Sequence, residues 1–129
     1  MEQKNKMMIV DDNPIDQMIS AHVLKTNFAN REVLIMESAY SALDYLEANK
    51  NNPEAMPSII LLDLDMPGMN GFGFLEQFNK FTEVIKNTCR IIVLTGSDVP
   101  SDIELMEADP LVSLLLTKPL RKSELIPVI

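Results

Sequence analysis

The segment from Ile59 to Gly71 constrains the fold of this chain more than any other. It begins with four aliphatic residues without a polar break, Ile59 to Leu62, and this run ends on Asp63. A short apolar run with Pro57 before it and a turn rich in proline and glycine after it is typical of a strand buried on both faces. Such strands lie inside parallel sheets, and functional groups of open α/β sheets collect just past the carboxyl ends of their strands. The sequence therefore predicts a carboxylate, Asp63, at a functional edge.

Four other apolar runs of strand length alternate with helical patterns. The predicted strands are Met7–Val10, Val33–Met36, Ile59–Asp63, Arg90–Thr95 and Leu111–Leu116. The first predicted helix runs from Pro14 to about Asn27 with Asn13 as N-cap, and the second from Ser38 or Ser41 to about Asn49. The third runs from Phe72 to Phe81, with an extension to Lys86 left open. The last two run from Pro100 to about Asp109 and from Ser123 to Ile126. This alternation favours an α/β fold, a doubly wound parallel sheet of five strands with helices on both faces.

Length and composition fit one domain over residues 1–129. Hydrophobic residues make up 47% of the 129 residues, enough to bury a core. The net charge of −8 argues against a nucleic-acid surface and against binding to anionic membranes. The single cysteine, Cys89, excludes an intrachain disulfide, and the N-terminal residues do not have the pattern of a signal peptide. We therefore expect a cytoplasmic protein.

Polar residues follow four of the predicted strands. Asp11 and Asp12 follow the first strand, and Asp63, Thr95 and Lys118 stand at the ends of the third, fourth and fifth strands. Because the carboxyl ends of parallel strands share one edge, we expect these five side chains to converge.

This set of residues suits phosphoryl chemistry. Adjacent carboxylates raise one another's pKa and need a cation, and oxygen ligands without His or Cys favour a hard ion, with Mg²⁺ as the first choice. A lysine and a threonine hydroxyl beside Mg²⁺ can stabilise the charged oxygens of a phosphoryl group. Asp63 is then the predicted nucleophile, which would form an aspartyl phosphate.

At these motifs the whole chain resembles the receiver domain of bacterial two-component response regulators, the CheY-like superfamily. The acidic pair in IVDDNPID, the segment LLDLDMPGMNG, the threonine in IIVLTGS and the Lys-Pro in LLLTKPL all match the family's pattern. The resemblance implies a flavodoxin-like sheet with strand order 2-1-3-4-5. It also implies that Asp63 is phosphorylated, that the backbone carbonyl of Asp65 joins Asp11, Asp12 and Asp63 in binding Mg²⁺, and that the bond before Pro119 is cis.

The resemblance also implies partners and a mechanism. A sensor histidine kinase or a histidine phosphotransfer protein would donate the phosphoryl group to Asp63. Thr95 and Lys118 would then move inward and bias the face formed by the fourth strand, the following helix and the fifth strand. The output would be contact with another protein by a monomer or weak homodimer, and the domain would catalyse only its own phosphorylation and dephosphorylation.

One position and the C-terminal segment depart from the family's pattern. Leu115 stands where the family usually has a Tyr or Phe that acts as a rotamer switch. Ten residues follow Pro119, and Pro127 interrupts them, whereas the family's last helix runs for several turns. These departures concern how a signal leaves the domain.

Two other functions remain open at this stage. The Asp63-Leu64-Asp65 motif also resembles the nucleophile motif of haloacid-dehalogenase phosphatases, but that family places its remaining metal carboxylates after the lysine, and here only Glu124 follows Lys118. A receiver that serves only as a binding module is the second alternative, against which the filled site argues. His22 is expected to pack on the apolar side of the first helix, and Cys89 to be an ordinary buried thiol.

Overall fold

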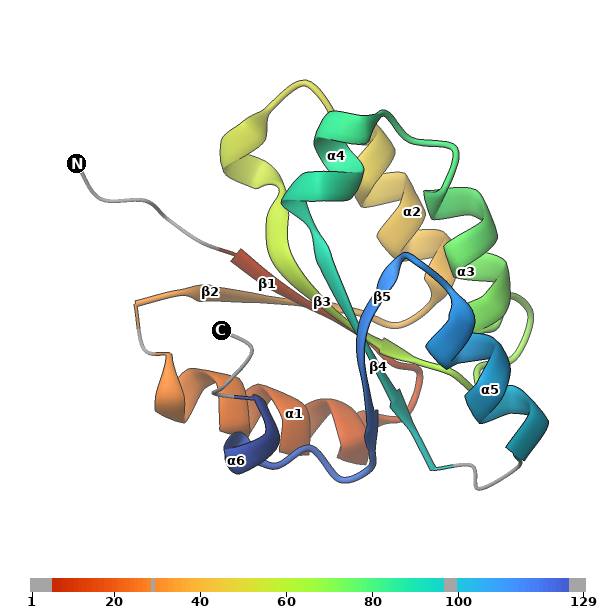
Figure 1. The fold of residues 1–129 in the computed structure, drawn as a ribbon. Coiled ribbons are helices and arrows are strands. Elements are labelled where there is room, and N and C mark those ends of the chain that lie inside the picture. The colour runs from red at the N-terminus through yellow and green to blue at the C-terminus, as the bar shows by residue number, and fades with distance from the viewer. Residues whose placement is uncertain (1–5, 29, 97–99, 126–129) are drawn as a thin grey trace.

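The computed structural model describes residues 6–28, 30–96 and 100–125. Five parallel strands form one sheet in the order β2-β1-β3-β4-β5, as expected (Figure 1). The strands are β1 (Lys6–Val10), β2 (Glu32–Met36), β3 (Pro57–Asp63), β4 (Arg90–Thr95) and β5 (Val112–Thr117). The chain starts in the middle of the sheet at β1, goes out to β2 and returns to β3, so the strand order reverses at β1 and β3. This reversal is where open α/β sheets bind their ligands.

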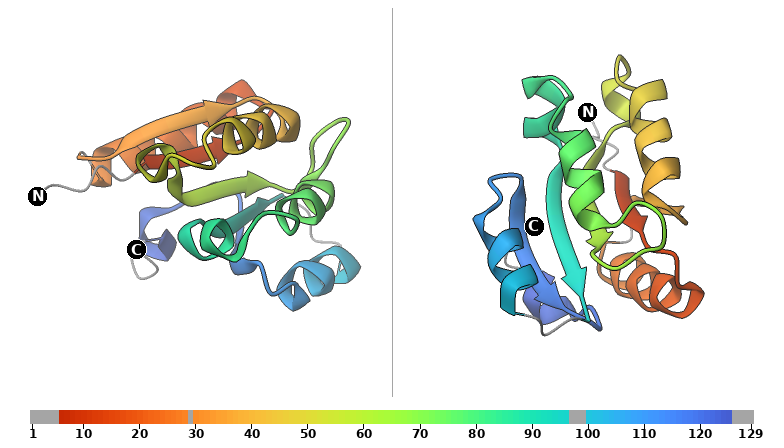
Figure 2. Two further views of the ribbon diagram at one scale, coloured as in Figure 1. Left: turned by 90° about the horizontal axis from the view of Figure 1, so that it is seen from above. Right: turned by 90° about the vertical axis from the view of Figure 1, so that its right-hand side faces the viewer.

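Helices cover both faces of the sheet (Figures 1 and 2). Their bounds are α1 (Pro14–Asn27), α2 (Ala39–Ala48), the 3₁₀ turn η1 (Pro53–Ala55), α3 (Gly71–Phe78), α4 (Glu83–Thr88), α5 (Pro100–Ala108) and α6 (Lys122–Leu125). α1 and α6 lie together on one face, and α2, α3 and α5 lie on the other. Among the described helices, none combines the length and the apolar character that crossing a membrane requires.

Alternate residues of the central strands feed two separate cores. Met8, Ile60 and Val93 point to the core under α2, α3 and α5, together with Phe74 and Phe78. The alternate residues point to the core under α1, which contains Met7, Ile9, Ile59, Leu61, Ile92 and Leu94. β1 and β3 are buried on both faces, and this explains why their sequences are continuous apolar runs.

The predicted elements differ from the structure mainly at their ends. β1, β2 and β3 begin one or two residues earlier than predicted, and β5 is shifted by one residue. The N-caps are confirmed: Asn13 Oδ1 accepts the backbone N–H groups of Ile15 and Asp16, and Ser38, not Ser41, caps α2. The turn η1 was not predicted, and Ile126, the predicted end of the last helix, lies outside the described residues.

The predicted helix from Phe72 to Phe81 is wrong at its C-terminal end. α3 ends at Phe78, and α4 is a separate short helix that begins after Thr82. The Lys80 and Phe81 N–H groups donate to carbonyls only three residues back, which closes a tight turn. The Phe81 ring lies 5.8 Å from the ring of Phe78, so the apolar spacing that suggested one helix comes from a turn folded back on α3.

The orientation of α1 was also predicted wrongly. His22 was expected to pack on the apolar side of this helix, but it is exposed, and Ile15 and Met18, which share its helical spacing, are 67% and 70% exposed. Val23, at the same spacing, is partly buried and packs against the core under α1. The residues of α1 that are buried are Ser20, Ala21 and Leu24. Ser20, Ala21 and Leu24 therefore form the face that packs on the sheet, while Ile15 and Met18 lie on the outer side of the helix.

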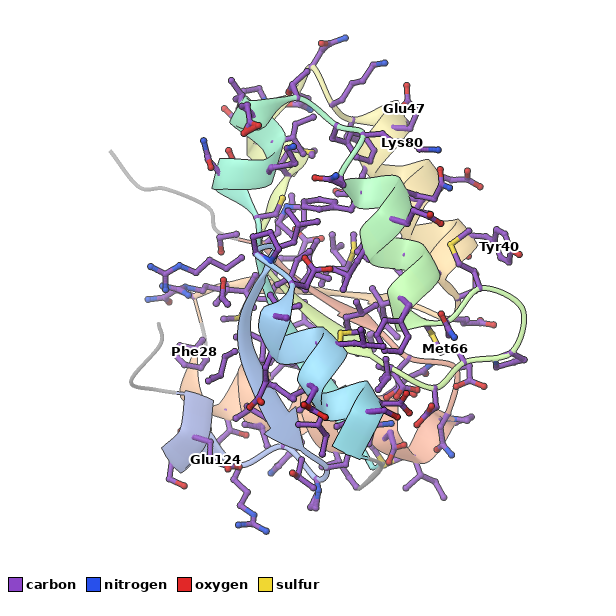
Figure 3. All side chains as sticks on the ribbon, turned by 45° about the vertical axis from the view of Figure 1, so that its right-hand side comes forward. Phe28, Tyr40, Glu47, Met66, Lys80 and Glu124 are labelled. Carbon is purple, nitrogen blue, oxygen red and sulfur yellow. The ribbon has the colours of Figure 1, made fainter. Side chains whose placement is uncertain are left out.

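The loop between β3 and α3 has two positions that require glycine. Gly68 has a φ of +77°, which favours glycine, and a Cβ there would lie 3.3 Å from the ring of Tyr40, which stands beside this loop in Figure 3. A Cβ on Gly71 would come within 3.0 Å of the Leu64 backbone, and the Gly71 N–H donates to the Leu64 carbonyl at 2.9 Å. These contacts fold the loop tightly against the end of β3, next to Asp63.

Candidate functional site

Side chains along a strand alternate between the two faces of the sheet, and this alternation brings three of the predicted side chains together. Asp11 continues the row of Met7 and Ile9 past the end of β1, and Asp63 continues the row of Ile59 and Leu61. Lys118 follows Leu116 in the same way after β5. All three therefore emerge on the side of the sheet that α1 covers.

The Lys118 ammonium lies among carboxylates. Its Nζ is 3.0 Å from Asp11 Oδ2, 3.2 Å from Asp63 Oδ1 and 2.8 Å from Asp16 Oδ2. The side chains of Asp11 and Asp63 are only 3% and 5% exposed, and that of Lys118 is 18% exposed. A buried charge needs an opposite charge close by, and each of these groups has one.

Backbone and side-chain hydrogen bonds fix Asp11 at the end of β1. The Asn13 N–H donates to Asp11 Oδ1 at 3.0 Å, and the Gln17 side-chain amide donates to the Asp11 carbonyl at 2.6 Å. The Asp11 N–H donates to the carbonyl of Met36 at 3.1 Å, so β2 also holds it in place. The turn that caps α1 thus also orients the acidic pair.

The three predicted metal-ligating side chains form a cluster. Carboxylate oxygens of Asp11, Asp12 and Asp63 all lie within 4.8 Å of one another. Asp12 is exposed, so one side of the cluster opens to solvent. Asp65 is exposed as well, and its N–H donates to Asp63 Oδ1 at 3.3 Å. A set of oxygen atoms this close, with an open side, fits a hard divalent cation that keeps some of its water.

Burial and neighbouring charge shift the acid–base properties of the site. Burial raises the pKa of the Asp63 carboxyl, the Asp11 carboxylate raises it further, and Lys118 partly offsets both, which leaves a pKa of about 6. Burial alone would lower the pKa of Lys118, but hydrogen bonds to Asp16 and Asp11 and the charge of Asp63 outweigh burial, so its pKa is raised. The lysine therefore stays charged.

Thr95 stands at the same edge of the sheet. It is the last residue of β4, is 2% exposed, and pairs in register with Thr117 at the end of β5. Its carbonyl accepts the Lys118 N–H at 2.9 Å, so the backbone of Thr95 helps to place Lys118. The bond between Lys118 and Pro119 is cis, as the resemblance implied.

Asp16 was missed by the sequence analysis, although it makes the shortest contact with Lys118. It lies in the first turn of α1, where an acidic residue is ordinary because it favours the helix dipole. One signal was present in the sequence: Asp16 lies in the first turn of a helix that begins two residues after Asp12, so it starts close to the acidic pair.

Other residues singled out in the sequence lie apart from this site. Cys89 is buried, and burial raises the pKa of its thiol to about 12, as expected for an inert core cysteine. Leu115 is half-buried and packs against the core under α2, α3 and α5. A hollow of about 290 Å³ lies between α2 and α3, and Glu47 and Lys80 are among its lining residues. It lies toward the end of the sheet away from the carboxyl ends of the strands (Figure 3).

Comparison with known proteins identifies the class. The family model of the response regulator receiver domain matches residues 7–129. The two-component response regulator ARR17 of Arabidopsis thaliana is 26% identical, over 96% of this chain and 82% of its own length. The crystal structure of a response regulator receiver protein from Dyadobacter fermentans is 31% identical and superposes with a TM-score of 0.84, covering 95% of this chain and 93% of that one.

Response regulator Rcp1 of Synechocystis is a further relative. Its sequence is 27% identical over 75% of this chain, which covers 65% of the length of Rcp1. The structure of its Mn²⁺-bound form is 26% identical, with a TM-score of 0.72, and the match covers 96% of this chain and 88% of that one.

The chain belongs to the receiver-domain family of two-component response regulators. Its function is therefore in phosphorelay signalling, and the alternative of a haloacid-dehalogenase phosphatase is not supported.

Proposed function

We propose that Asp63 accepts a phosphoryl group from a histidine kinase or a histidine phosphotransfer protein in a Mg²⁺-dependent reaction. The observation that carries the proposal is the burial of Asp63 between the Asp11 carboxylate and the Lys118 ammonium, 3.2 Å away. An Asp63 oxygen forms a bond to phosphorus as the bond from phosphorus to the donor imidazole nitrogen breaks. The imidazole leaves with that electron pair and takes up a proton.

The acidic cluster supports a divalent cation. Asp11, Asp12 and Asp63 would hold Mg²⁺ through side-chain oxygens, with the backbone carbonyl of Asp65 as a further ligand. When bound, the ion neutralises charge on the phosphoryl oxygens. Lys118 would hold one of these oxygens, and the Thr95 hydroxyl would donate a hydrogen bond to another.

The surface around the site supports docking of a protein donor. Ile15, Met18 and Ile19 form an exposed apolar stripe on α1, the helix whose N-cap residue, Asn13, donates a hydrogen bond to Asp11 of the acidic cluster. Exposed apolar groups next to a reactive centre are typical of a protein-binding surface. We assign this stripe to the histidine-containing donor, because the donor must bring its imidazole to Asp63 for transfer.

The signal would leave through β4, α5 and β5. Phosphorylation adds negative charge beside Thr95, the last residue of β4, and Lys118, the residue after β5. Leu105 on α5 is 60% exposed and offers an apolar contact on this face. The domain over residues 1–129 would act as a monomer or weak homodimer, contact another protein, and catalyse only its own phosphorylation and dephosphorylation.

A phosphorylation assay tests this function. With Mg²⁺ and acetyl phosphate, the intact mass should rise by about 80 Da, one phosphoryl group. Asp63→Asn and a chelator should each abolish the gain. Unchanged labelling of Asp63→Asn, or sustained hydrolysis of a generic phosphomonoester that depends on Asp63, would contradict the proposal.

A further inference from the structure

Lys118 contacts one carboxylate that the proposed reaction does not use. A lysine ammonium has three N–H donors, and here three carboxylates surround it, from Asp11, Asp16 and Asp63. Asp11 and Asp63 both belong to the acidic cluster, whereas Asp16 lies outside it. Its oxygen is nevertheless nearest to Nζ, at 2.8 Å.

The position of Asp16 on α1 is not accounted for by helix capping alone. Its backbone N–H donates to Asn13 Oδ1 at 3.1 Å, which is the capping interaction. Its side chain lies on the same helix face as Ser20 and Leu24, one and two turns later, and both of those are buried against the sheet. The face of α1 that packs on the sheet is therefore the face that presents Asp16 to Lys118.

The three carboxylates differ in what they can do during the reaction. Once a cation and a phosphoryl group occupy the site, Asp11 is engaged by the cation and Asp63 carries the phosphoryl group. Asp16 has neither task, so it can keep its hydrogen bond to Lys118 throughout. If one N–H of the Lys118 ammonium stays bound to Asp16, the directions of its two other N–H groups are restricted.

We propose that Asp16 is a positioning residue that anchors the Lys118 ammonium and aims it at the phosphoryl group on Asp63. The inference rests on the proposed function of Asp63. Asp16 acts through Lys118 and makes no contact with the phosphoryl group itself. A carboxylate placed only to stabilise the helix would act independently of Lys118.

The test compares initial rates of phosphorylation by acetyl phosphate at saturating Mg²⁺. Asp16→Ala should slow the reaction about three- to tenfold, a positioning effect of modest size. Asp16→Asn keeps an oxygen acceptor at the same place and should fall between Ala and wild type. If the charge of Asp16 merely repelled the anionic donor, both substitutions would instead raise the rate, and the proposal would be wrong.

A double-mutant cycle with Lys118→Ala separates positioning from helix stabilisation. In the Lys118→Ala background, Asp16→Ala should change the remaining rate by less than about twofold, because the residue through which it acts is gone. An equal loss with and without Lys118 would overturn the proposal. Asp102→Ala, which removes an acidic residue from the first turn of α5, is the matched control and should leave the rate unchanged.

A second cycle uses urea unfolding and does not depend on activity. Asp16→Ala and Lys118→Ala should shift the urea midpoint non-additively if the two side chains are in contact, and additive shifts would overturn the proposal. If wild type is not phosphorylated but the shifts are non-additive, the proposed function fails while the anchoring contact stands.

Discussion

Among single residues, Asp63 shows how the proposed function would lower stability. Its side chain is 5% exposed, and burial beside Asp11 raises its pKa from the usual 3.8 to about 6. The folded state therefore binds this proton more tightly than the unfolded state does. Its contribution to stability falls as the pH rises from about 4 to about 6, and above that range the ionised carboxylate destabilises the fold.

We accordingly expect Asp63→Asn to stabilise the protein at pH 7.5 without Mg²⁺. A pKa raised by about two units corresponds to roughly 1–3 kcal/mol in the free energy of unfolding. The difference from wild type should shrink toward pH 4.5, where Asp63 is protonated in the folded state. Urea unfolding at the two pH values measures it, and an Asn variant that is less stable at pH 7.5 would contradict the account.

At the scale of elements, α1 carries two different faces. One face packs on the sheet through Ser20, Ala21 and Leu24 and presents Asp16 to the site. The other exposes the stripe of Ile15, Met18 and Ile19. The same helix can therefore position a residue of the site and receive the phosphoryl donor.

Met18→Glu tests the role of the stripe. A charge in its centre should slow transfer from a phosphorylated histidine phosphotransfer protein that labels wild type, by about tenfold or more, because it must be desolvated on docking. The rate with acetyl phosphate should be unchanged, since this small donor does not need the surface. Val84→Glu on α4, at a position that is 75% exposed, serves as the control. Equal rates of protein transfer for both variants would exclude the stripe as the docking surface.

For the molecule as a whole, a cation held by the acidic cluster would couple its binding to folding. A cation that binds only the folded state adds about 2.7 kcal/mol at a concentration one hundred times its dissociation constant. Mg²⁺ should therefore raise the midpoint of thermal unfolding by several degrees, and a chelator should reverse the effect. The rise in the unfolding midpoint caused by Mg²⁺ should be smaller below about pH 6, where protonation removes Asp63 as a ligand. A Mg²⁺ effect that is equally large in Asp63→Asn would show that the ion binds elsewhere.

Much of this protein is determined by local sequence. The apolar runs define the five strands, because each has the length and composition of a buried strand. The residues after them, from Asp11 to Lys118, must meet at one edge because the alternation of strands and helices makes the sheet parallel. Asn13 and Ser38 mark helix starts, since their side chains satisfy N–H groups within their own turns.

Other features were decided only by tertiary structure. The rotation of α1 exposes Met18 and His22, and it depends on which face packs on the sheet, here that of Ser20, Ala21 and Leu24. The break after Phe78 depends on Phe81 folding back onto α3. The contact between Asp16 and Lys118 joins residues 102 positions apart, and it forms only because sheet register and helix rotation place both side chains on the same side of the sheet. Spacing along the chain shows which residues can reach the edge, and packing decides which of them touch.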